Sequence, residues 1–179
     1  MCGMDETNFL NYQPPSWDEW FIRGVYWAAT KSKDKKTKIA ALIVKDKRII
    51  STGFNGIPQG VNDDIIERNE RPTKYFFYCH GEENAICNAS RNGISINEST
   101  LYTNANPCSS CCKSIIQSGI KKVIIHKQYN DLCKLSNRDQ WKNHDKITYD
   151  MFSEAGIEVI EFDKFLNIDA YLDGKIINV

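Results

Sequence analysis

The sequence predicts an α/β protein built on a mixed five-stranded sheet with helices on both faces. Two observations support this class. Helical and strand-like segments alternate after an N-terminal helix and a hairpin, and five apolar segments have the short length of strands. A chain of 179 residues is also long enough to bury one sizeable core. We therefore expect a single domain over residues 1–179.

The first half of the chain is predicted to contain one helix and one hairpin. Ser16 is a suitable N-cap, and the apolar residues that follow it recur at helical spacing. A charged loop over residues 33–38 comes next, and then two apolar strands that turn at Asp46 and Lys47. The strands cover residues 39–46 and 47–55. The segment over residues 56–73 is rich in Gly, Pro, Asn and acids, which is typical of a long surface loop.

The second half is predicted to alternate helices with the remaining three strands. The elements, in order, are a helix over residues 80–92, a strand over 99–105, a helix over 108–117, a strand over 121–126, a helix over 147–156 and a strand over 157–162. The polar stretch over residues 127–146 is expected to be irregular. His126, at the end of a strand, is expected to be solvated or to cap a helix.

Composition and charge exclude several function classes. With 23 basic and 23 acidic residues, the formal net charge is zero, so no polynucleotide partner is expected. No apolar run approaches the ~20 residues that cross a bilayer, and a signal segment is absent from the N-terminus. We therefore expect a soluble cytoplasmic protein without a membrane partner. In a reducing compartment, clusters among its seven cysteines point to metal binding or catalysis.

Two segments carry residues with the chemistry of a metal site. CHGEENAIC places His80 at the start of a predicted helix, and NPCSSCC places Cys108 and Cys111 one helical turn apart at the start of another. Zinc in catalytic sites takes three protein ligands and leaves a fourth position for water. One histidine and two cysteines meet that count. Spacing alone leaves Cys112 as a rival to Cys111, because Cys108 and Cys112 are also helical neighbours.

Glu82 follows the candidate histidine by two residues. From a helix start it can reach the open position of the metal without binding it, where a carboxylate can take a proton from water and return it to a leaving nitrogen. The alternative is a structural zinc-binding module without chemistry. That alternative requires a fourth protein ligand and leaves Glu82 without a role.

The chain resembles the deoxycytidylate (dCMP) deaminase family of the cytidine deaminase superfamily. HGE followed by PCSSC fits the HxE and PCxxC signature of zinc nucleobase deaminases. The resemblance extends through KSKD, STGFNGIPQG, VNDD, KYFFYCHGEENAI and QSGIKKVI, and covers a core of about residues 17–162. It implies a three-layer α/β/α cytidine-deaminase-like fold. One departure is Gly81, because the family usually has alanine between the histidine and the glutamate.

The resemblance implies a reaction and roles for the motif residues. Zinc would be held by His80, Cys108 and Cys111, and Glu82 would be the general acid and base. An activated water would attack C4 of cytosine, so that dCMP becomes dUMP and ammonia and supplies thymidylate synthesis. Enzymes acting on dCTP, or on both nucleotides, are the alternatives within this class.

The resemblance also implies contacts to the nucleotide. Asn55 is similar to the residue that holds the sugar hydroxyl or the base, and the backbone amide of Gly81 would face the base. Tyr129 would contact the phosphate or the ring. Lys31 stands where similar proteins often carry arginine, and would balance the phosphate charge.

Regulation is implied by the same family. Many members are homohexamers that dCTP activates and dTTP inhibits. The regulatory nucleotide would lie on the glycine-rich loop, with Mg²⁺ held by two acids beside the phosphates. The residues of this predicted site are Gly53, Asn55, Gly56, Gly60, Asp63 and Asp64. The alternative interpretation is that Asp63 and Asp64 are only part of a solvated loop.

Overall fold

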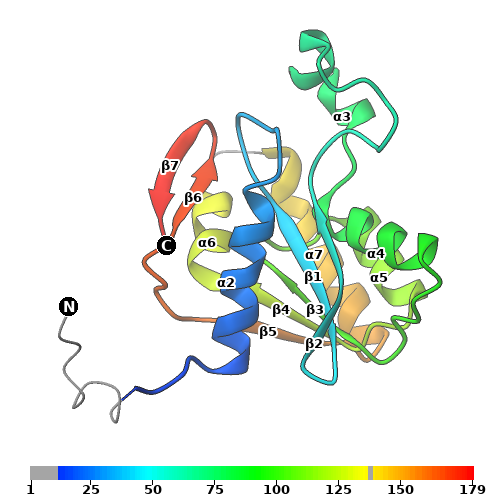
Figure 1. Ribbon diagram of the computed structural model, residues 1–179, viewed down its shortest axis with the longest axis vertical. Coiled ribbons are helices and arrows are strands. Elements are labelled where there is room, and N and C mark those ends of the chain that lie inside the picture. The colour runs from blue at the N-terminus through cyan, green and yellow to red at the C-terminus, as the bar shows by residue number, and fades with distance from the viewer. Residues whose placement is uncertain (1–11, 137–138) are drawn as a thin grey trace, which may run out of the picture.

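A five-stranded mixed sheet forms the centre of the molecule (Figure 1). The computed structural model describes residues 12–136 and 139–179. The strands are β1 (Ala40–Lys45), β2 (Arg48–Phe54), β3 (Thr100–Thr103), β4 (Lys122–His126) and β5 (Glu158–Phe162). Their order is β2-β1-β3-β4-β5, with β1 antiparallel to both neighbours and β3, β4 and β5 parallel to one another. The predicted α/β class and mixed sheet are confirmed.

Helices cover both faces of this sheet. One face carries α2 (Trp17–Ala29) and α6 (Lys127–Leu135), and the other carries α4 (Gly81–Arg91), α5 (Ser109–Gln117) and α7 (Asp139–Glu154). Successive side chains of β1 point to opposite faces of the sheet, so Leu42 packs in the core on the α2 side and Ile43 in the core on the α4 side. Each face has its own buried apolar cluster, so the fold has three layers.

Local signals explain the first elements. The Ser16 hydroxyl accepts a hydrogen bond from the Glu19 amide at 3.2 Å and caps α2. Between β1 and β2, Asp46 and Lys47 have φ values of 51° and 58°, as a two-residue hairpin turn requires. Both predictions agree with the structure.

Several segments differ from the predictions. The stretch predicted to be irregular forms α6 and the start of α7, and the predicted loop contains a short 3₁₀ helix, η1 (Ile66–Asn69), and α3 (Lys74–Phe77). A second hairpin, β6 (Asp169–Leu172) and β7 (Lys175–Asn178), follows the sheet. Leu172 and Val179 of this C-terminal region join the α2-side core, which therefore extends past Phe162.

His126 is neither solvated nor a capping side chain. It occupies the N-cap position of α6, but its ring is fully buried and makes no capping bond. The Lys164 carbonyl can only accept, so Nε2 donates to it at 2.9 Å and Nδ1 accepts from the Tyr26 hydroxyl at 2.6 Å. The ring therefore links α2 to the segment after β5. None of the helices in the described ranges is long and apolar enough to cross a membrane.

Candidate active site

A cavity of about 350 Å³ opens beside the carboxyl end of β3. The chain leaves β3 through Ala105, Asn106 and Pro107, all of which line the cavity, and reaches Cys108 at the start of α5. His80 and Glu82 line it from the start of α4. Ligand sites in sheets with parallel strands typically lie at this end of the strands.

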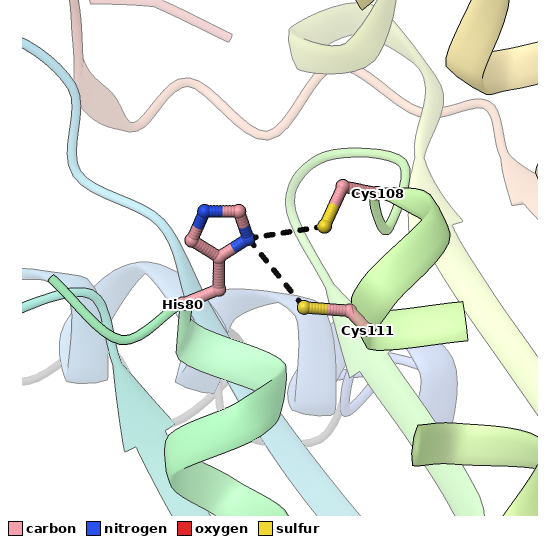
Figure 2. A group of neighbouring side chains, drawn as sticks. All are labelled: His80, Cys108 and Cys111. Carbon is pink, nitrogen blue, oxygen red and sulfur yellow. Dashed lines mark hydrogen bonds between the residues drawn. The ribbon is translucent and has the colours of Figure 1, made fainter. Parts of the chain in front are cut away.

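Three potential metal ligands meet at this cavity. His80 Nδ1 lies 3.3 Å from Cys108 Sγ and 3.5 Å from Cys111 Sγ, and the three ligand atoms lie within 4.8 Å of one another. Figure 2 shows that the imidazole comes from the start of α4 and both thiols from the start of α5. Tetrahedral zinc with ordinary bond lengths would separate a nitrogen and a sulfur ligand by about 3.6 Å. The three side chains therefore fit zinc.

Cys112 does not join this group. Its side chain is fully buried in the core on the α4 side, where its thiol donates to the Thr148 carbonyl at 3.7 Å. Within the ranges that the structure describes, the His80, Cys108 and Cys111 trio is the one group of at least three potential ligands this close together. The geometry separates the two cysteines that spacing alone could not.

The trio shares its protons. The hydrogen bond from Cys111 lowers the pKa of the Cys108 thiol, and the hydrogen bond to Cys108 raises the pKa of His80 to about 9. The Cys111 thiol, which supplies the proton to Cys108, has its pKa raised. A divalent cation would replace these protons, because zinc binds thiolate and neutral imidazole.

Glu82 is the second residue of α4 and lies beside the trio. The side chain is 3% exposed, and the Cys111 thiol lies 3.8 Å from its Oε2. Burial raises the pKa of this carboxyl, which makes the protonated form more accessible than for a carboxyl in water. A group that can both hold and release a proton therefore lies next to the metal-ligand trio.

Asn55 also lines the cavity, but its amide is largely committed to the protein. Oδ1 accepts from the Ile39 amide at 2.9 Å, and Nδ2 donates to the Thr37 carbonyl at 2.8 Å and to Asp34 at 3.1 Å. With both amide protons used, Asn55 can still offer a second lone pair of Oδ1 to a ligand hydroxyl.

Two predicted nucleotide contacts lie outside the cavity lining. Tyr129 on α6 is fully buried in the core, and its hydroxyl donates to the Tyr171 carbonyl at 2.7 Å. Lys31 is exposed in the loop after α2. The C-terminal hairpin, which the predictions did not include, supplies the partner of Tyr129 and explains its inward position.

Gly81 separates the two active-site residues of α4 and packs against the sheet. A Cβ at this position would lie 2.9 Å from Ala40 Cα and 3.1 Å from the Ile39 carbonyl oxygen. The absence of a side chain therefore lets the start of α4 approach β1 closely.

The predicted regulatory residues lie in different local surroundings. Gly53 packs against α4, where a Cβ would lie 2.2 Å from the Ala85 amide nitrogen. Gly56 pairs with Cys79 in an isolated bridge, and Gly60 has a φ of 89° in the loop. The two acids, Asp63 and Asp64, lie 2.8 and 3.6 Å from the Lys33 ammonium in this structure.

Several cavity residues were not predicted. They are Asp34, Thr37, Ile39, Arg71, Lys74, Tyr75, Tyr78, Ala105, Asn106, Pro107, Asn130, Cys133, Lys134 and Asp145. Most of them belong to no local motif. Asn106 and Pro107 precede Cys108 in the NPCSSCC motif. Lys74, Tyr75 and Tyr78 lie in the KYFFY run, where a lysine among aromatic residues is a further sequence signal that could have marked a functional wall.

Comparison with known proteins agrees with this site. The family model for the cytidine and deoxycytidylate deaminase zinc-binding region matches residues 15–127. A deaminase encoded in the luxG 3′ region of Aliivibrio fischeri is 37% identical over 143 residues, which cover 80% of this chain and 91% of that protein. Human deoxycytidylate deaminase is 34% identical over 155 residues, which cover 82% of this chain and 86% of that enzyme.

A solved structure shows the same fold. The dCMP deaminase of cyanophage S-TIM5, in complex with dCMP and dUMP, superposes with a TM-score of 0.65 and 26% identity, covering 84% of this chain and all of that one. The family match contains His80, Glu82, Cys108 and Cys111, the residues that meet at the cavity. The chain therefore belongs to the cytidine and deoxycytidylate deaminase family.

Proposed function

We propose that this protein catalyses the zinc-dependent hydrolytic deamination of dCMP to dUMP and ammonia. The observation that carries the proposal is the arrangement of a three-ligand set beside a buried carboxyl in one cavity. His80, Cys108 and Cys111 fit zinc, and Glu82 lies 3.8 Å from one of the thiols. The human and cyanophage relatives named above support dCMP as the substrate.

Glu82 would move the protons of this reaction. Zinc, when bound by the trio, supplies Lewis-acid chemistry that lowers the pKa of water to about 7. Glu82 takes the first proton from the attacking water and delivers it to N3 of the base, while a C4–O bond forms. It then takes the remaining proton from the hydroxyl on C4 and delivers it to the amine, so that the C4–N4 bond breaks, the C4 carbonyl forms and ammonia leaves. The raised pKa of Glu82 suits a group that must alternate between these two states.

The direct test compares Glu82→Gln with the wild-type protein. The zinc content is expected to stay the same, because Glu82 is not in the ligand trio, whereas kcat for ammonia release from dCMP falls by about 10²–10⁴-fold. Glu83→Gln is the matched control. Glu83 lies on the exposed side of α4, where its carboxylate accepts from the His80 amide, and an amide oxygen can still accept there.

The alternative of a structural zinc module predicts a different result. A zinc-loaded protein that releases no ammonia from any cytosine nucleotide, and whose metal has a fourth protein ligand, would refute the deaminase. Side-by-side assays on dCMP, dCTP, CMP and deoxycytidine would then separate the nucleotide alternatives, which differ in the phosphate tail rather than in the reacting base.

The cellular role follows from the proposed reaction. In the cytoplasm, dUMP would supply thymidylate synthesis. For control of the enzyme, our prediction is a homohexamer that dCTP activates and dTTP inhibits, with Mg²⁺ beside the regulatory phosphates. Saturation curves with and without dCTP test the regulation, because identical hyperbolic curves would contradict it. Sedimentation velocity measures the predicted oligomer.

A further inference from the structure

The wall of the cavity includes a segment that leaves the fold and returns to it. Residues 57–78 form an excursion between β2 and α4, and its two ends are held together where Gly56 and Cys79 exchange hydrogen bonds of 3.1 and 2.9 Å. Figure 1 shows this segment, which contains α3, projecting from the body of the domain. Arg71 and Lys74 of the excursion both line the cavity. Two cations therefore reach the cavity from one segment.

Lys74 is a nearly buried ammonium with donors to spare. The side chain is 8% exposed, and its Nζ lies 2.5 Å from Asp34 Oδ2. That carboxylate is the one within ion-pair distance of Lys74 in the described ranges, and it also accepts from the Asn55 amide. The Tyr78 ring lies 5.2 Å from the ammonium. Because an ammonium has three N–H groups, a ligand oxygen in the cavity would find donors already in place.

Arg71 adds a second cation three residues earlier. Its guanidinium is 43% exposed and lies 3.7 Å from Asp173, a distance longer than a charge-assisted hydrogen bond. Its carbon lies 5.9 Å from the centre of the Tyr75 ring. A guanidinium with five N–H donors can therefore bind two oxygens of one anion without first breaking a short ion pair.

The other cations near the cavity are less suited to bind an anion. Lys134 lines the cavity from α6. Three carboxylates lie 3.8–3.9 Å from its ammonium and balance its charge. Lys31, which the sequence predicts as the phosphate contact, lies outside the lining. The geometry thus points away from the loop after α2 and toward the excursion.

We propose that Arg71 and Lys74 bind the 5′-phosphate of the nucleotide and make this site select a nucleoside monophosphate over the free nucleoside. The inference rests on the proposed function. A phosphate monoester is a compact anion whose terminal oxygens can accept from the two parallel N–H groups of an arginine and from a lysine ammonium. The cavity volume of about 350 Å³ lies near the lower end of the roughly 300–1,000 Å³ of small-molecule pockets, which suits one phosphate better than three.

Arg71→Gln is the first variant for the test, since an exposed side chain can be replaced with little risk to folding. For the zinc-loaded enzyme, kcat/KM for dCMP is expected to fall by about 10- to 100-fold, the range that one charge-assisted hydrogen bond supplies. The value for deoxycytidine, which lacks the phosphate, is expected to change by less than about threefold. Lys113→Gln, an exposed cation on α5, is the control for loss of one positive charge.

Lys74 is tested together with its partner. Removing one member of a buried ion pair leaves the other charge unpaired, so Lys74→Gln is combined with Asp34→Asn. This double variant is expected to lower the preference for dCMP over deoxycytidine in the same direction as Arg71→Gln. An equal loss for both substrates in Arg71→Gln would overturn the inference. So would a loss for dCMP alone in Lys31→Gln while Arg71→Gln keeps its preference.

Calorimetric titration of dUMP and deoxyuridine separates this inference from the proposed function. If dCMP is not deaminated but dUMP binding still weakens in Arg71→Gln and deoxyuridine binding does not, the deaminase proposal fails and the phosphate site stands. If dCMP is deaminated and Arg71→Gln binds dUMP as tightly as the wild-type protein does, the phosphate site fails and the deaminase stands.

Discussion

Gly81→Ala tests how closely the catalytic helix must approach the sheet. The added Cβ would lie 2.9 Å from Ala40 Cα, whereas carbon atoms in ordinary contact lie about 3.5 Å apart, so a shift of about 0.6 Å is needed. Ala40 cannot easily give way, because it is fully buried in β1 between two strands and its amide donates to Asn104 Oδ1 at 3.1 Å. The start of α4 is therefore expected to move instead.

The magnitude follows from two opposing effects. Overpacking of this kind costs about 1–3 kcal/mol, and replacing glycine by alanine in a helix returns about 0.5–1 kcal/mol. The midpoints of these two ranges leave a net destabilisation of about 1 kcal/mol, which lowers Tm by about 2–4 °C for a chain of this size. Because His80 and Glu82 flank the shifted residue, kcat for dCMP is expected to fall by about 3- to 30-fold, given that a misplacement of about 1 Å can cost 10²-fold.

Thermal unfolding, zinc content and steady-state kcat measure these effects. Gly56→Ala is the matched control, since a Cβ there would meet no atom within 4 Å. A Gly81→Ala protein as stable and active as the wild type would contradict this prediction, because it would show that β1 can shift without a cost in free energy.

Two further predictions concern buried groups outside the metal site. Lys74→Met leaves the charge of Asp34, which is 3% exposed, without its ion-pair partner, so the free energy of unfolding measured in urea is expected to fall by about 3–5 kcal/mol. Adding Asp34→Asn should restore part of this free energy, and no recovery in the double variant would contradict the pairing argument. Burial lowers the pKa of His126 below its ordinary 6.5, so the unfolded state takes up the proton first and stability is lost as the pH falls below about 6.5. His126→Gln is expected to flatten this dependence by up to about 1.4 kcal/mol per pH unit between pH 7.5 and 5.5, and parallel stability curves for the two proteins would contradict it.

Local patterns predicted the parts of the molecule that short-range physics decides. The hairpin turn needs two residues at positive φ, and Asp46 and Lys47 provide them. The metal-ligand trio needs two cysteines about one turn apart at the start of α5, and the sequence shows Cys108 followed by two candidates, Cys111 and Cys112. Both features depend on residues within about one helical turn of one another, so local spacing predicted them, although it left the choice between the two cysteines open.

Long-range packing decided the parts that were missed. Helix α6 is polar on average, and its buried Tyr129 is held by the Tyr171 carbonyl, 42 residues away in the C-terminal hairpin. No local pattern contains that contact, so the segment was expected to be irregular. The family resemblance, and not a local pattern, led to the prediction that Tyr129 contacts the nucleotide. Similarly, His126 is buried by partners 100 residues before it and 38 residues after it.

The same distinction separates the two halves of the cavity. The metal-ligand trio and Glu82 come from the starts of two helices, and both helix starts follow from motifs. Arg71 and Lys74 come instead from the excursion, and Lys74 is held by an ion pair with Asp34, 40 residues earlier in the chain. The sheet does not constrain the length of this excursion. If Arg71 and Lys74 bind the phosphate as proposed, changes in the excursion can alter which cytosine nucleotide is accepted. The metal-ligand trio and Glu82 would remain in position. Because the excursion is closed at its base by the Gly56–Cys79 bridge, one residue before His80, it can vary in length and sequence without moving the start of α4.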